Sequence, residues 1–519
     1  MIKKENIFFS FLLVVFALSS TTSAAPTFND KMLTGYELAQ DWDLIAAEEL
    51  SNSLLKKHPE SGDAHFLSAR IEFLKGNYEH ASEILEKAGD SYEEVSEFKK
   101  RIEATRKATQ NFVTRETAHF RFRYKEGPDE VLLTYAEEVL EKSYLVLGEI
   151  LDHYPQEKVL IEFYPDRQPF SKISPLTLQD ILTSGTVALC KYNRIMMISP
   201  GSLVRGFNWM DTLSHEYVHY LLTKKSRNQL PLWTHEGIAK LLETRWRNDK
   251  KYLSPIMETI LSGALKNDYR IALEDMMPSL AKLKTAKDVQ LAYAEVSTMM
   301  EYLAESKGME IFTQLLEDLA KGIRFEESFQ NRAGHDILSF QNNWEIWAKN
   351  KELKFIPGIT ALTKEFKNQN KLESEKDYKG LGTRRAQDLT FLGDILKSRD
   401  HYNAAILEYQ KAKEESSTHS PILFNKLAGT YIQTGKYDEA ELLLKESLEY
   451  YSDFHTTLAN LGELYFVSER FYKAQKYLEK AVRINPFNPF IHTRLIELYD
   501  RMSMTEEKKL QTQLFSLID

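Results

Sequence analysis

Apolar and polar residues alternate along residues 119–124, where the sequence reads HFRFRY. A period of two is typical of a strand with one buried face, so this stretch is predicted to be a strand. KVLIEFYP at 158–165 is predicted to be a second strand. GTVALCKYNRIMMISP at 185–200 is predicted to form two more, which turn near residues 191–194. These segments together predict a small sheet.

Between and after these strands, the apolar residues recur with the spacing of a helix. An amphipathic helix is predicted over residues 131–154, between the first two strands. From residue 200 to about residue 350 the apolar positions follow helical spacing. Residues 111–350 are therefore predicted to be one domain, with a small sheet followed by a helical half. The polar stretch 351–385 is predicted to be a linker.

Small residues recur at intervals of 35 and 34 positions within residues 391–500. The matching positions are Gly393, Ala428 and Gly462, then Ala405, Ala440 and Ala474, then Ala412, Ser447 and Ala481. Small side chains at such points let two antiparallel helices approach closely, and this pattern resembles the tetratricopeptide repeat. A weaker copy runs through residues 33–108. Both ends of the chain are therefore predicted to be helical repeats.

The N-terminus has the pattern of a secretory signal peptide. Lys3 and Lys4 precede an apolar run from Ile7 to Leu18, and small residues follow up to Ala25. The alternative is an uncleaved anchor, but the run of 12 residues is shorter than the roughly 20 that a membrane span needs. We expect export to the periplasm or the outside of a bacterial cell, with no integral membrane segment after cleavage.

These observations predict a division of the chain into five parts. The parts are a signal peptide (1–24), N-terminal repeats (25–110), an α+β domain (111–350), a linker (351–385) and C-terminal repeats (386–519). The protein is predicted to be predominantly α overall.

Composition narrows the classes of partner and of site. The net charge of the 519 residues is −9, and basic residues are interspersed with acidic ones without a basic stripe, which argues against nucleic acid as a partner. Hydrophobic residues make up 43% of the chain, enough for sizeable cores. Cys190 is the only cysteine, so an intramolecular disulfide and a cysteine-based metal site are excluded.

The motif HEYVH at 215–219 is the main chemical signal. On a helix, His215 and His219 lie about 40° apart on one face and can hold one metal ion. Glu216 is rotated off that axis and can act on a water molecule as general base. Asp211 and Thr212 are predicted to cap the start of the helix. The alternative interpretation is a helix with two ordinary surface or core histidines.

A second acidic motif follows in WTHEGIA, where Glu236 lies in the first turn of a new helix. A buried carboxylate facing two histidines is costly unless it binds a cation, so Glu236 is predicted to be the third ligand. His235 is the competing ligand, but it points about 100° away from Glu236 on that helix. Two histidines and one glutamate form a known catalytic zinc set.

HEYVH followed by WTHEGIA resembles the gluzincin metallopeptidases, which carry HExxH and a distal glutamate. The closest resemblance is to peptidase MA-like domains found beside tetratricopeptide repeats in bacterial exported proteins, and it covers about residues 111–350. It implies a zincin-like α+β fold with a small sheet and active-site helices. It also implies Zn²⁺ as cofactor, with His215, His219 and Glu236 as metal ligands and Glu216 as the catalytic base.

The sequence also departs from related families. Sixteen residues separate His219 from Glu236, fewer than in the aminopeptidases of the same clan. SGTVALC at 184–190 lacks the glutamate with which those enzymes grip a free amino terminus, so an endopeptidase is favoured.

Three further residues are candidates for supporting roles. Residue 240 is a lysine where similar enzymes have an acid, so Glu243 or Asp211 is the candidate that orients a histidine, unless each is a plain surface acid. The resemblance also implies an aromatic residue or histidine on a later helix that stabilises the oxyanion, and Tyr293 is the candidate for this role in the catalytic set, the alternative being a core tyrosine.

The prediction that follows is an exported zinc metallopeptidase, a hydrolase that cuts peptide bonds with a zinc-bound water and Glu216 as base. The repeats would recruit a protein or peptide substrate, or a protein partner. The first alternative is a tetratricopeptide adaptor or scaffold whose metallopeptidase-like domain is inactive or structural. A second alternative is metal-dependent amide cleavage in a cell-wall peptide.

Overall fold

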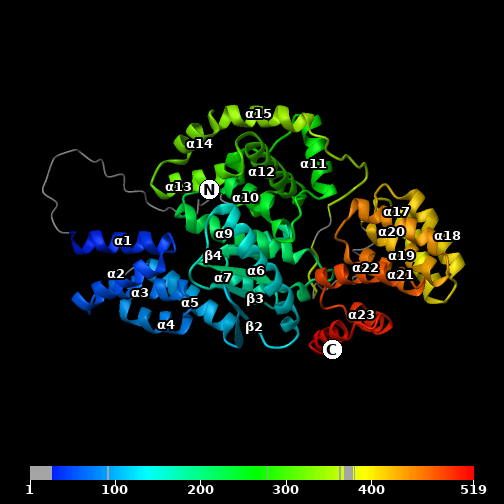
Figure 1. The fold of residues 1–519 in the computed structure, drawn as a ribbon, viewed down its shortest axis with the longest axis horizontal. Helices are drawn as coiled ribbons and strands as arrows, with labels where there is room; N and C mark the ends of the chain where they lie inside the picture. Colours follow the sequence, from blue (N-terminus) through cyan, green and yellow to red (C-terminus); the bar gives the residue numbers. More distant parts are fainter. Residues whose placement is uncertain are drawn as a thin grey trace, which may run out of the picture.

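The computed structural model describes residues 26–89, 93–277, 279–361, 364–367, 378 and 380–518. Helices at the two ends of the chain flank a central part that contains a sheet (Figure 1). The predicted fold class, a small sheet with helices between helical repeats, is confirmed. The predicted signal peptide lies outside the described residues.

Antiparallel helices form the N-terminal block. They are α1 (Phe28–Gln40), α2 (Leu44–Lys57), α3 (Gly62–Leu74), α4 (Tyr78–Leu85) and α5 (Glu93–Thr109). Small residues lie where these helices meet: Ala47, Ala64, Ala69 and Ala81 are fully buried. The helices are thus packed through the small positions of the predicted repeat.

The central domain contains a mixed sheet of five strands in the order β1-β2-β3-β5-β4. The strands are β1 (Phe112–Glu116), β2 (Phe120–Lys125), β3 (Val159–Tyr164), β4 (Ala188–Lys191) and β5 (Arg194–Ile198). The inner pairs β2–β3 and β3–β5 are parallel, and the outer pairs β1–β2 and β5–β4 are antiparallel. β4 therefore lies at one edge of the sheet.

The helices of the central domain cover the sheet and continue beyond it (Figure 1). They are α6 (Val131–Leu151), α7 (Arg167–Ile173), α8 (Leu178–Ser184), α9 (Trp209–Ser226), α10 (Leu232–Leu242), α11 (Pro255–Lys266), α12 (Ala286–Lys307), α13 (Glu310–Ala320), α14 (Phe325–Ala333) and α15 (Ile337–Asn350). Phe120, Ile161 and Ile195 share the main core with α6 and α9. Tyr164 and Met196 pack on the other face with α7 and α8.

The C-terminal block is a stack of helix pairs. Its helices are α17 (Arg384–Ser398), α18 (Tyr402–Glu415), α19 (Pro421–Gln433), α20 (Tyr437–Tyr450), α21 (His455–Val467), α22 (Phe471–Ile484), α23 (Pro489–Arg501) and α24 (Thr505–Ser516). A Cβ atom at Gly393 would lie 2.5 Å from the Tyr409 ring, and one at Gly462 would lie 2.5 Å from Leu478. The spacing of small residues in the sequence thus marks the real contacts between paired helices.

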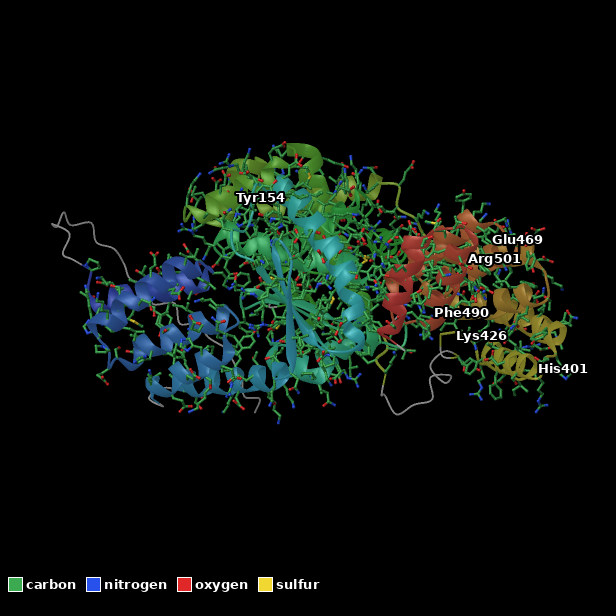
Figure 2. The ribbon with its side chains drawn as sticks, turned by 60° about the horizontal axis from the view of Figure 1, so that its bottom comes forward. Tyr154, His401, Lys426, Glu469, Phe490 and Arg501 are labelled. Carbon is green, nitrogen blue, oxygen red and sulfur yellow. The ribbon has the colours of Figure 1, made fainter. Side chains whose placement is uncertain are left out.

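Both blocks are docked on the central domain by buried polar contacts. The Tyr78 hydroxyl of α4 donates a hydrogen bond of 2.6 Å to Glu162 of β3, which also pairs with buried Arg194 at 3.0 Å. On the other side, the Trp209 indole donates to the carbonyl of Arg483 in α22 at 2.8 Å. Figure 2 shows the C-terminal block, marked by His401 and Glu469, at the opposite end of the molecule from the N-terminal helices.

Candidate metal centre

The helix α9 carries HEYVH and is anchored between the sheet and α6. It begins at Trp209, and the Asn208 side chain caps it by accepting a hydrogen bond from the backbone N–H of Asp211. The prediction that Asp211 and Thr212 cap the helix is therefore wrong. The cap lies earlier because the helix starts one turn earlier and Asp211 belongs to its first turn.

His215 and His219 face Glu236 of α10. The prediction that Glu236 lies in the first turn of its helix is wrong, because α10 begins at Leu232 and Glu236 falls in the second turn. The Nε2 atoms of the two histidines are 3.1 Å apart. Glu236 Oε2 lies 3.4 Å from His215 Nε2 and 3.3 Å from His219 Nε2. One ligand atom from each residue lies within 4.8 Å of the others. The structure thus brings together the three predicted metal ligands.

The arrangement of these atoms fits a bound cation. Glu236 Oε2 is buried and makes no hydrogen bond of regular geometry, although the two imidazole nitrogens face it. Burial raises the pKa of Glu236, but the adjacent histidines outweigh this and hold the pKa well below its usual range. An ionised carboxylate and two imidazoles that point at one position form the donor set of a His2Glu zinc site.

A carboxylate contacts His215 at Nδ1, the ring nitrogen that does not face Glu236. The Nδ1 atom of His215 lies 3.1 Å from Glu243 Oε2, and Glu243 also pairs with Lys240. A hydrogen bond at Nδ1 fixes the ring and leaves Nε2 free to bind a metal. Of the two acids considered from the sequence, the structure selects Glu243. Asp211 instead pairs with Arg247 and accepts from the Trp246 indole.

His235 holds His219 in a similar way. Its Nδ1 atom lies 2.6 Å from His219 Nδ1, and its Nε2 atom lies 3.4 Å from the Thr223 hydroxyl. Burial lowers the pKa of His235 to about 3, so its ring stays neutral and can accept a hydrogen bond from His219. The sequence placed His235 away from the ligand set but gave no signal for this supporting contact.

Glu216 lies beside the ligand set and faces the edge strand β4. Its Oε2 atom is buried without a hydrogen-bond partner, and the backbone N–H of Cys190 donates to the carboxylate. Burial raises the pKa of Glu216. A carboxylate with a raised pKa and one unused oxygen is suited to accept a proton.

Tyr293 of α12 lies next to the candidate metal ligands. Its ring centroid is 6.1 Å from that of His215. Burial raises the pKa of Tyr293 well above its usual value, and the negative charge of Glu236, to which it is hydrogen-bonded, raises it further. The hydroxyl therefore keeps its proton and can donate a hydrogen bond. The structure brings this predicted residue into the same site.

The segment that carries this centre is similar to a known protein family. A Peptidase MA superfamily domain is detected. The match spans residues 154–350 and thus includes α9, α10 and α12. Tetratricopeptide repeats are detected over residues 44–93, 423–452 and 455–488, and such repeats indicate protein partners.

Two curated proteins are similar to parts of the chain. One is the uncharacterized protein YhcO of Bacillus subtilis (strain 168), which is 20% identical over 200 residues, covering 36% of this chain and 50% of the relative. The other is the small glutamine-rich tetratricopeptide repeat-containing protein 2 of Mycosarcoma maydis. It is 29% identical over 119 residues, covering 23% of this chain and 34% of the relative. The chain thus spans half or less of the length of these relatives.

Two solved structures align with most of the chain but at low similarity. The crystal structure of the APC/C hetero-tetramer Cut9–Hcn1 aligns over 94% of this chain and 79% of its own, with a TM-score of 0.26 and 10% identity. The crystal structure of yeast Tom70 aligns over 94% of this chain and 89% of its own, with a TM-score of 0.20 and 12% identity. Similarity at this level supports no inference about the peptidase domain.

In the described part of the chain, none of the helices combines the length and the apolarity that crossing a bilayer requires.

Proposed function

We propose that the protein is a zinc-dependent metallopeptidase of the gluzincin type. The observation that carries this proposal is the convergence of His215, His219 and Glu236 on one position, with a buried carboxylate oxygen that has no other partner. The detected Peptidase MA superfamily domain supports it, since this segment contains all three residues. The site residues belong to two helices whose orientation is fixed by packing, as a preorganised metal site needs.

His215, His219 and Glu236 would hold the zinc ion, and Glu243 and His235 would keep the two imidazole rings in the ligating orientation. When bound, zinc supplies Lewis acidity, which lowers the pKa of a water molecule and polarises a carbonyl group. Three protein ligands leave a fourth position open, as catalytic zinc sites require.

Glu216 acts as the proton carrier of the proposed reaction. It takes a proton from the attacking water while the water oxygen bonds to the peptide carbonyl carbon. It then delivers that proton to the nitrogen of the leaving amine as the carbon–nitrogen bond breaks. Its unpartnered Oε2 is available to accept and return the proton. Burial of the carboxylate keeps bulk water from exchanging protons with this oxygen.

Tyr293 is the proposed donor to the developing oxyanion. Its hydroxyl remains protonated, because burial and Glu236 both raise its pKa. A donor aimed at the position where negative charge develops stabilises the transition state more than the ground state. In this chain Glu236 holds that hydroxyl next to the metal ligands, which supports a catalytic role over that of a core tyrosine.

An internal peptide bond is the proposed target. β4, which runs beside Glu216, carries no carboxylate that could bind a free amino terminus. Its outer edge pairs with no other strand of the described residues, so an extended peptide can add to the sheet there. An endopeptidase is therefore favoured over an aminopeptidase.

We further propose that the protein is exported and that its repeats recruit a protein substrate or partner. Lys3, Lys4 and the apolar run that follows support a cleaved signal peptide. The two repeat blocks flank the peptidase domain on opposite sides (Figure 1) and are docked on it, so a protein bound to them would lie close to the metal centre.

The Glu216→Gln variant tests the proposed mechanism. Glutamine keeps the size of the side chain but cannot accept the proton, so peptide cleavage should fall by about 10²- to 10⁴-fold. The variant should bind zinc as the parent does, because Glu216 is not a ligand. Cleavage is measured on a proteome-derived peptide library by mass spectrometry, with Glu326→Gln as the control at an exposed position.

Abundant cleavage by Glu216→Gln would contradict the assigned base. A parent chain that binds zinc but cuts neither peptides nor proteins would contradict the peptidase proposal itself. In that case an adaptor, in which the repeats alone carry the function, would be favoured.

A further inference from the structure

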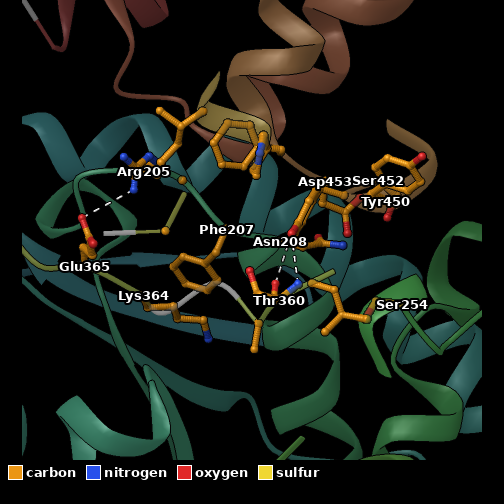
Figure 3. Close-up of a pocket in the computed structure, with 18 of the residues that line it drawn as sticks. Arg205, Phe207, Asn208, Ser254, Thr360, Lys364, Glu365, Tyr450, Ser452 and Asp453 are labelled. Carbon is orange, nitrogen blue, oxygen red and sulfur yellow. Dashed lines mark hydrogen bonds and ion pairs between the residues drawn. The ribbon is translucent and has the colours of Figure 1, made fainter. Parts of the chain in front are cut away.

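A cavity of about 890 Å³ lies between the peptidase domain and the C-terminal block (Figure 3). The loop that leads into α9 forms one wall and contributes Phe207 and Asn208. The C-terminal block forms another with Tyr450, Asp453 and Phe454. Thr360, Ala361, Lys364 and Glu365, which follow the peptidase domain, line it as well. Its volume lies within the range of about 300–1,000 Å³ that is typical of ligand sites.

Lys364 reaches into this cavity from a segment that is firmly held. Residues 364–367 run along residues 202–204, with backbone hydrogen bonds of 2.8 Å from Val204 to Glu365 and from Lys367 to Ser202. Phe366 anchors the segment, because its side chain is only 2% exposed and packs in the core that Tyr164 and Met196 form with α7 and α8. The position of Lys364 is therefore set by the fold.

The side chain of Lys364 lies beside Phe207 and the residues that precede β4. Its Nζ atom is 4.7 Å from the centroid of the Phe207 ring. Its Cδ atom is 3.7 Å from where a Cβ atom of Gly185 would be, close to the start of β4. Glu216 and Glu243 of the metal centre are near enough to affect its charge. Lys364 thus lies within electrostatic range of two carboxylates of the candidate metal centre.

The ammonium group of Lys364 lacks a direct counter-ion. Among the described residues, no carboxylate lies within ion-pair distance of its Nζ atom. Burial and the charge of Lys240 lower its pKa to about 8, while Glu243 and Glu216 act in the opposite direction. The group is thus still positively charged at neutral pH. Lys364 is partly buried. A partly buried cation without a partner is costly, and an anion supplied by a ligand would relieve that cost.

The other charged groups around the cavity already have partners. Arg205 pairs with Glu365 at 3.5 Å, and Arg167 stacks on the Phe366 ring at 5.0 Å. Asp453 is hydrogen-bonded to Asn208, and burial and Asp211 raise its pKa. In the view of Figure 3, Phe207 and Asn208 separate Asp453 from Lys364. The cavity therefore favours an anion at the Lys364 end and disfavours one at the Asp453 end.

We propose that this cavity is a substrate site next to the metal centre, in which Lys364 selects peptides that carry a carboxylate near the cleaved bond. The carboxylate would come from an aspartate or glutamate side chain or from a free carboxyl terminus. The aromatic and proline side chains of the walls, among them Tyr450, Phe454 and Pro255, would pack against the rest of the peptide. This inference rests on the proposed peptidase function.

Binding of short hydroxamate peptides to the zinc-loaded chain tests the proposal without requiring cleavage. The hydroxamate chelates zinc, and it is placed at the amino end in one series and at the carboxyl end in another, which covers both sides of the metal. Within each series, peptides are compared in pairs that differ only by Asp or Asn at one position, and this position is moved along the peptide from pair to pair. A terminal carboxylate that would otherwise be free is replaced by an amide. One further member with a free carboxyl terminus tests the second source of the carboxylate.

At one position, the Asp peptide or the free-carboxylate peptide should bind at least about tenfold more tightly than its neutral counterpart, as expected for a charge-assisted hydrogen bond. Lys364→Gln should reduce this ratio to about one, and Lys364→Glu should invert it. Lys367→Gln is the matched control, because Lys367 lies on the same segment but lines a different cavity. It should leave the ratio unchanged.

Equal affinity for acidic and neutral peptides at every position would overturn the proposal, and so would a preference that survives Lys364→Gln. A chain that binds the hydroxamates with the predicted preference but cuts no peptide would contradict the peptidase function while supporting the site. A chain that does not bind zinc would contradict both.

Discussion

The two histidines of HEYVH each have a partner at Nδ1, and the two partners differ in chemistry. Glu243 lies at Nδ1 of His215, and neutral His235 lies at Nδ1 of His219. A carboxylate makes the imidazole that it contacts more basic, whereas a neutral imidazole mainly fixes orientation and tautomer. His215 is therefore expected to be the stronger of the two histidine ligands.

Glu243→Ala should weaken zinc binding by about 10- to 100-fold, because the ring of His215 loses the group that orients it. The measurement is a competition titration of the purified chain against a chelator of known affinity. Glu326→Ala, an exposed glutamate on α14, is the matched control and should bind zinc as the parent does. Equal affinity in Glu243→Ala and its control would show that Glu243 does not support the site.

Part of this site could be predicted from the sequence and part could not. Two histidines four apart share a helix face wherever that helix lies, and a glutamate in the next helix is a short-range candidate for the third ligand. The choice between Glu243 and Asp211 depends on how α10 crosses α9 and on where Arg247 lies. Arg247 neutralises Asp211 at 2.9 Å, and no sequence period encodes that contact.

At the scale of elements, the candidate metal centre depends on a close contact between α10 and α12. Gly237 follows Glu236 directly, and a Cβ atom there would lie 2.5 Å from the carbonyl oxygen of Val296. Only glycine lets the two helix backbones approach so closely. This contact places Glu236 on one helix and Tyr293 on the other beside the same pair of histidines.

Gly237→Ala should force α10 away from α12 and displace Glu236. We expect a loss of about 1–3 kcal/mol in the free energy of unfolding, as for other overpacked sites, together with weaker zinc binding. Gly263→Ala on α11 is the control, since a Cβ atom there meets only Phe355 at 3.7 Å. Denaturant unfolding and a zinc titration measure both effects. Unchanged zinc affinity in Gly237→Ala would contradict this role for the contact.

Strong periodicity made most elements predictable. β3, β4 and β5 lie within the stretches expected from alternation or from continuous apolar runs, and β2 extends one residue beyond its stretch. β3 is buried along its whole length. β1 was not predicted, because its residues FVTRE are half-buried or exposed and show no regular alternation. The short helices α7 and α8 were also missed, since seven residues carry too little helical period to detect.

At the scale of the whole molecule, the C-terminal block is docked at the start of α9, the helix that carries HEYVH. A Cβ atom at Gly206 would lie 2.4 Å from the carbonyl oxygen of Ile484, and Trp209 donates its hydrogen bond to Arg483 nearby. The sequence predicted the repeats but not this docking. Contacts between residues more than 270 positions apart leave no period in the sequence.

Gly206→Ala should loosen this docking, because the new methyl group would meet a backbone carbonyl. The melting temperature should fall by several degrees, and small-angle scattering should show a larger radius of gyration. Gly429→Ala on α19 is the control, since a Cβ atom there meets only the Lys397 amine at 3.8 Å. If Gly206→Ala matched its control in both measurements, the C-terminal block would not depend on this contact.

The zinc content of purified residues 25–519 tests the central claim most directly. His215, His219 and Glu236 converge on one position, so the parent should bind about one zinc per chain, and His219→Ala should lose it. The content is measured by inductively coupled plasma mass spectrometry after dialysis against zinc. No bound zinc in the parent, or equal zinc in parent and variant, would contradict the His2Glu centre.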